Sequence, residues 1–60
     1  MSKDTRLEVI KALAYGVPLE DIANMAEVDS TEIARIKRDY ADEIKTRRAE
    51  IEREMDNGNS

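Results

Sequence analysis

The segment from Leu19 to Ile36 constrains the fold of this chain more than any other, because its apolar residues fit two short helices joined by a tight turn. Small or apolar side chains recur at helical spacing where two crossing helices would touch, and Val28 points inward between them. Ala23 is small enough to let the next helix cross closely. The whole set is Leu19, Ile22, Ala23, Ala26, Val28, Ile33 and Ile36. We expect a helix over 19–26, a turn over 27–29 and then another helix.

Capping residues mark the ends of these two helices. Pro18 suits the start of the first helix, because its fixed φ is already helical and its missing N–H would have no partner there. Asp29 can cap the second helix, and Glu32 then completes an Asp-x-x-Glu variant of the capping box. A frame shifted by one residue makes Ser30 the cap instead.

Composition indicates a single all-α domain. The chain has 60 residues with only two Gly and one Pro, so little interrupts a helical pattern. It has no Cys and no His, which excludes disulfides, thiol chemistry and the usual zinc sites. No apolar run approaches the ~20 residues of a membrane span, and the N-terminal MSKDT is not a signal region. We expect a cytoplasmic protein that is not an enzyme, with no catalytic residues, metal, cofactor or small-molecule substrate and no membrane partner.

A scaffold helix is expected before the central segment, from about Asp4 to Tyr15. Ser2 or Asp4 can accept N–H groups at its start, and Gly16 can supply a left-handed residue at its end. Its apolar face is expected to consist of Leu7, Ile10, Leu13 and Ala14.

The third helix has no internal stop signal before Asn57-Gly58, so the sequence predicts one continuous helix from Ser30 to about Met55. Such a helix would be roughly 39 Å long at about 1.5 Å per residue. Its apolar positions are Ile33, Ile36, Tyr40, Ile44, Ile51 and Met55. The expected organisation is a core domain over 1–44, a projecting extension of the third helix over 45–56 and a disordered polar tail over 57–60.

Two sequence strings carry a family resemblance. The run G-V-P-L-E-D-I-A, followed by V-D-S-T-E-I-A-R-I, resembles the helix-turn-helix modules of small bacterial and phage regulators, resolvases, sigma factors and small terminase subunits. The resemblance implies a three-helix domain with a long C-terminal helix, in which the third helix lies in the DNA major groove. Glu27 stands where the turn usually has Gly, at a cost of about 1 kcal/mol. This leaves open a differently shaped turn or a slightly longer preceding helix.

The third helix offers a candidate DNA-reading face opposite its apolar residues. Arg35 and Arg38 can contact guanine edges, and Thr31 can contact a base edge or a thymine methyl. Ser30 and the helix start can take a phosphate. Further basic residues can reach the DNA backbone: Lys37, Lys45, Arg47 and Arg48. The competing interpretation is a solvated face, in which Arg35 and Arg38 pair with Asp39 and Asp42 at i,i+4 spacing.

The charge pattern bears on DNA affinity. The chain carries a net charge of −4, and phosphate binding depends on Lys and Arg. Residues 30–48 are the only net basic segment, with six basic and four acidic residues. We expect modest affinity for DNA from a single copy, so function would need a homodimer, an array or a larger DNA-bound protein.

The projecting half-helix is a candidate association surface, formed by Ile44, Arg48, Ile51 and Met55. The function expected first is a phage or mobile-element DNA-binding regulator acting in transcription regulation. The alternative is a protein-binding accessory factor in DNA recombination, such as an excisionase-like directionality factor that contacts a recombinase through the C-terminal helix. An antagonist that mimics DNA charge is a weaker third hypothesis, because the basic segment lies on the exposed helix.

Overall fold

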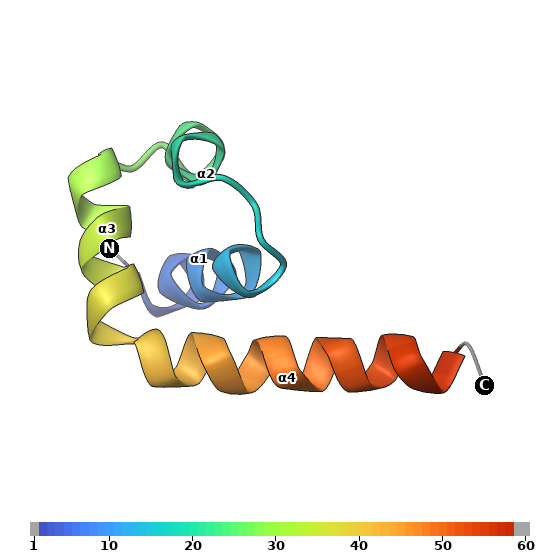
Figure 1. Cartoon of the computed structure of the whole chain (residues 1–60). Coiled ribbons are helices and arrows are strands. Elements are labelled where there is room, and N and C mark those ends of the chain that lie inside the picture. The colour runs from blue at the N-terminus through green and yellow to red at the C-terminus, as the bar shows by residue number, and fades with distance from the viewer. Residues whose placement is uncertain (1, 59–60) are drawn as a thin grey trace.

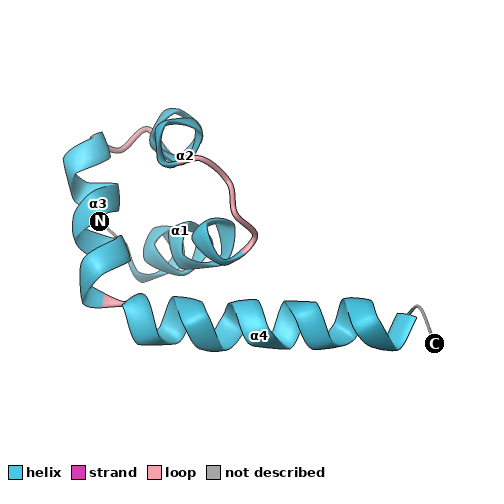
Figure 2. Cartoon of the chain, viewed as in Figure 1, coloured by secondary structure: helices cyan, strands magenta, loops and turns pink. Residues whose placement is uncertain are grey.

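The computed structural model describes residues 2–58 of the chain, with side chains described for residues 2–55. Four helices follow one another: α1 (Lys3–Ala14), α2 (Leu19–Ala26), α3 (Ser30–Asp39) and α4 (Ala41–Gly58). Short loops join them, and residues 2–58 contain no strand (Figure 2). The all-α prediction is confirmed.

Both ends of α1 are capped by local hydrogen bonds. The Ser2 hydroxyl accepts the N–H of Thr5 at 3.2 Å, so the cap is the first of the two expected candidates. At the other end, Gly16 has a φ of +84°. The N–H of Gly16 donates to the Leu13 carbonyl and that of Val17 to the Ala12 carbonyl, both at 3.1 Å. These two bonds form a Schellman motif, which ends the helix and turns the chain toward α2.

The core lies where α1 is covered by the other helices (Figure 1). Among residues 2–55, six apolar residues are buried: Val9, Ile10, Ala14, Ile22, Ile33 and Ile36. Val9 is 1% exposed, although the apolar face predicted for α1 omitted it. Leu7, which that face included, is only half-buried. The reason is that α1 is packed on more than one side, so its buried surface is wider than one stripe.

The prediction of one continuous third helix is wrong. α3 ends at Asp39 and α4 begins at Ala41, with Tyr40 between them at φ −113° and ψ 27°. Figure 1 shows that α4 leaves α3 at a steep angle and runs beneath α1. The bend brings Ile44 against the core cluster, and burying apolar surface there favours the bent chain over a straight helix. The guanidinium of Arg6 on α1 lies 5.4 Å from the centre of the Tyr40 ring, a cation–π contact between α1 and the residue at the bend.

The distal part of α4 extends beyond α1, so the molecule measures 40 × 20 × 17 Å along its principal axes. Ile51 is half-buried, and Met55 is 66% exposed. The expected boundary between residues 44 and 45 falls inside α4 rather than at a break. Of the predicted tail over 57–60, residues 57 and 58 belong to α4 and the last two lie outside the described residues. Within the part described, none of the helices combines the length and apolarity that crossing a bilayer requires.

Candidate nucleic-acid interface

α2 and α3 are joined by a turn in which Glu27 adopts the left-handed conformation, at φ 55° and ψ 43°. The N–H groups of Glu27 and Val28 both donate to the Ala23 carbonyl. Val28 is half-buried and packs against the core between the two helices. Glutamate therefore takes the conformation that glycine usually supplies. The turn keeps its left-handed shape, and α2 ends at Ala26 without being lengthened.

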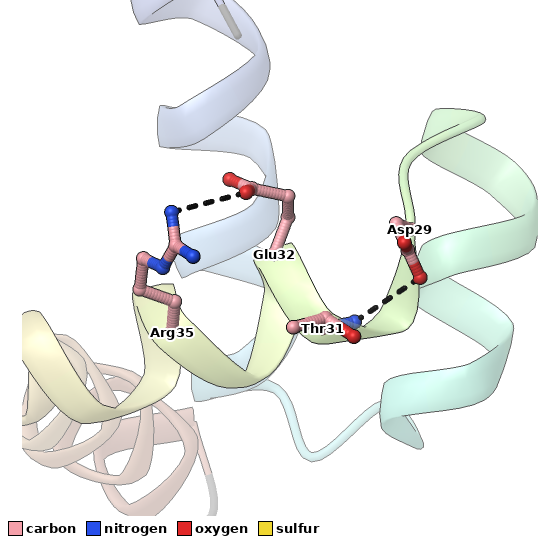
Figure 3. Close-up of polar contacts among 4 residues, drawn as sticks. All are labelled: Asp29, Thr31, Glu32 and Arg35. Carbon is pink, nitrogen blue, oxygen red and sulfur yellow. Dashed lines mark hydrogen bonds and ion pairs between the residues drawn. The ribbon is translucent and has the colours of Figure 1, made fainter.

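Asp29 is the cap of α3, which resolves the two expected frames. One of its carboxylate oxygens accepts the N–H of Thr31 at 3.4 Å (Figure 3). Glu32 does not complete the predicted capping box, in which its side chain would bond to the backbone N–H of Asp29. Its carboxylate instead lies 3.1 Å from the guanidinium of Arg35, one turn further along the helix.

Five of the residues predicted to contact DNA lie on the exposed surface of α3. Ile33 and Ile36 are buried, and the side of α3 turned away from them faces solvent. Arg35 and Arg38 have side chains 57% and 77% exposed. The exposed set is Ser30, Thr31, Arg35, Lys37 and Arg38.

The two arginines pair with acids other than those predicted. Arg35 pairs with Glu32, and the Nε of Arg38 lies 3.2 Å from a carboxylate oxygen of Asp39. The predicted i,i+4 pairing of Arg38 with Asp42 fails because the bend at Tyr40 places Asp42 on α4. Ion pairs this exposed contribute only about 0.2–1 kcal/mol. Both guanidiniums can therefore exchange these partners for DNA at small cost.

The candidate association residues of α4 divide into two groups. Ile44 packs against the core cluster of the same chain, so its buried surface is not available to a partner. Arg48 lies over the loop after α1, with Nη2 3.7 Å from the position that a Cβ on Gly16 would take. Ile51 and Met55 lie further along α4, and the distal part of that helix extends beyond α1 (Figure 1).

Arg47 on α4 lies against α1, a position that the sequence did not predict. It shares a hollow with residues of α1, among them Leu7 and Lys11. Its guanidinium lies 3.6 Å from the Glu43 carboxylate. Its Nε is buried with no hydrogen-bond partner among the described residues. Arg47 thus faces α1 and is poorly placed for the DNA backbone contact expected of it.

Comparison of the chain with protein-family models, curated proteins and solved structures found no match. Among the described residues, no group of three or more acidic side chains is arranged to hold a metal ion. The exposed face of α3 is the candidate site, because it carries the exposed guanidinium groups of Arg35 and Arg38, which can bind anionic or hydrogen-bond-accepting groups.

Proposed function

We propose that this chain is a small helix-turn-helix DNA-binding regulator of phage or mobile-element type that acts in more than one copy. The observation that carries the proposal is the position of α3. It follows a left-handed turn after α2, buries Ile33 and Ile36, and exposes Thr31, Arg35 and Arg38 on its other side. This is the arrangement in which a helix can enter the major groove.

The size and chemistry of α3 suit the groove. An α-helix with its side chains is about 10–12 Å in diameter, and the B-DNA major groove is about 12 Å wide and admits such a helix. Arg35 and Arg38 offer planar donors for the O6 and N7 of guanine, and Thr31 offers a hydroxyl and a methyl group. The net charge of −4 keeps the affinity of one copy modest, which is why we propose several copies on one site.

The test is the double variant Arg35→Ala/Arg38→Ala, titrated against duplex DNA by fluorescence anisotropy at two salt concentrations. Each bidentate arginine–guanine pair contributes about 1–3 kcal/mol, so loss of both pairs should lower affinity for the preferred sequence at least tenfold. Lys11→Ala/Arg53→Ala is the matched control, because it removes the same charge from two exposed residues outside α3. Unchanged binding by the double variant, or no binding by the wild type, would sink the proposal.

The distal part of α4 favours one second candidate, a protein-binding accessory factor of the excisionase-like kind. Met55 is 66% exposed on a helix that projects past α1 (Figure 1), and an apolar side chain there suits contact with a larger protein. The test is binding to a recombinase encoded beside the chain, measured by calorimetry. Loss of binding in Ile51→Asp/Met55→Asp but not in Arg35→Ala/Arg38→Ala supports the accessory factor, and the reverse pattern removes it.

A further inference from the structure

A hollow between the α1–α2 loop, α3 and α4 is lined by two basic residues and no acidic one. Its lining consists of Leu13, Gly16, Val17, Pro18, Leu19, Lys37, Ile44 and Arg48. The chain as a whole has 14 acidic and 10 basic residues. Each of the three other hollows described contains at least one carboxylate. The charge of this hollow is therefore opposite in sign to that of the chain.

The two cations line the same hollow because of the bend at Tyr40. On a straight helix, Lys37 and Arg48 would be roughly 16 Å apart along the axis, at about 1.5 Å per residue. The bend between α3 and α4 lets both line one hollow. The Arg48 guanidinium reaches over Gly16, with Nη2 3.7 Å from the position of a Cβ there.

Neither cation has a carboxylate partner among residues 2–55, whose side chains the structure describes. Arg35, Arg38 and Arg47 each have a carboxylate within 4.0 Å, and among residues 2–55 Lys37 and Arg48 have none. Both side chains are exposed. Their charges are thus available to an anion from outside, and the apolar floor of the hollow can support their aliphatic stems.

The hollow adjoins the proposed DNA-reading face on one side only. At about 100° per residue, Lys37 lies on the flank of α3 that also carries Ser30 and faces α2. Glu32 and Asp39 lie on the opposite flank, and Figure 3 shows the Glu32 side chain directed toward Arg35 and away from Asp29. A phosphate strand would be attracted by Lys37, at the end of the first flank away from Glu20, which lines another hollow beside Ser30. It would be repelled by Glu32 and Asp39 on the opposite flank.

We infer that Lys37 and Arg48 form a phosphate-binding pair that holds one strand of the DNA backbone beside the groove that α3 enters. This inference rests on the proposed function and fixes which side of α3 the backbone follows. The N-terminus of α2 adds little attraction for a phosphate, because Glu20 and Asp21 in its first turn offset the partial positive charge at that end of the helix. Arg48 then serves DNA binding, and association is left to Ile51 and Met55.

The experiment compares Lys37→Gln/Arg48→Gln with Lys11→Gln/Arg53→Gln, which removes the same charge from exposed residues outside the hollow. Anisotropy titrations of a labelled duplex at four salt concentrations give the slope of log affinity against log salt. The slope should become shallower by about 0.9 for each phosphate that is no longer neutralised, or about 1.8 for the pair. The decrease in affinity should be similar for duplexes of different sequence. The control pair should keep the wild-type slope.

Each outcome supports or overturns the phosphate-binding pair. Lys37→Arg/Arg48→Lys should keep the slope, and circular dichroism checks that every variant is folded. An unchanged slope in Lys37→Gln/Arg48→Gln overturns the inference, while the proposed function stands if Arg35→Ala/Arg38→Ala still weakens binding. An equal decrease in both charge-matched pairs reflects net charge alone and also overturns it. A wild type that binds no DNA overturns both.

Discussion

Glu27 is the residue at which the backbone is most constrained, because it is the non-glycine residue with a positive φ in the described chain. A left-handed conformation costs a side-chain-bearing residue about 1 kcal/mol or more. Glycine removes that cost, and its greater freedom in the unfolded state offsets part of the gain in stability. We expect Glu27→Gly to raise stability by about 0.5–1 kcal/mol, which is a rise in Tm of about 2–8 °C. Thermal unfolding followed by circular dichroism measures it. A lower Tm would show that the turn does not hold residue 27 in this conformation.

Gly16 has a positive φ in the turn after α1, as Glu27 has in the turn after α2, so replacing it with alanine tests the same backbone cost in the opposite direction. Its φ is +84°, and a Cβ there would make only an ordinary 3.7 Å contact with Arg48. The expected destabilisation by Gly16→Ala is therefore the backbone cost alone, about 1 kcal/mol. The same thermal melts should show Tm falling by about 4–8 °C. If Gly16→Ala leaves the Tm unchanged, the left-handed turn after α1 contributes little to the fold.

At the scale of elements, α4 is held to α1 by few apolar side chains, and Ile44 is the one that reaches the core cluster. Truncating a buried isoleucine to alanine costs about 2–5 kcal/mol. Because Ile44 is only half-buried, we expect Ile44→Ala to cost about 1–2 kcal/mol. Hydrogen exchange should quicken in α4 more than in α2 or α3. Ile51→Ala, the same substitution on the same helix outside the core cluster, should have a smaller effect; equal effects would contradict the packing described.

The sequence predicted the helices better than it predicted how they join. The bounds of α2 and the glycine after α1 follow from short-range chemistry and were anticipated, and the cap at Ser2 was one of two expected candidates. The bend at Tyr40 was not, because the apolar steps from Ile36 to Ile44 fit a straight or a bent helix equally well. Only the tertiary gain from covering α1 selects the bent form. The hollow that joins Lys37 and Arg48 depends on that bend, so no local pattern could have revealed it.

At the scale of the whole molecule, one small acidic domain offers few cations to DNA, so two copies on one duplex should bind far better than one. The net charge is −4 and the long axis is 40 Å. We predict that joining two chains by a flexible linker of about 40 Gly and Ser residues, which spans roughly 35 Å, raises affinity for a two-turn duplex. That reach matches half-sites about 34 Å apart, and the gain should be about 100-fold or more. Anisotropy titration measures it. A fusion with Arg35→Ala/Arg38→Ala in one copy should lose the gain, and a fusion that binds no tighter than the single chain would contradict action in multiple copies.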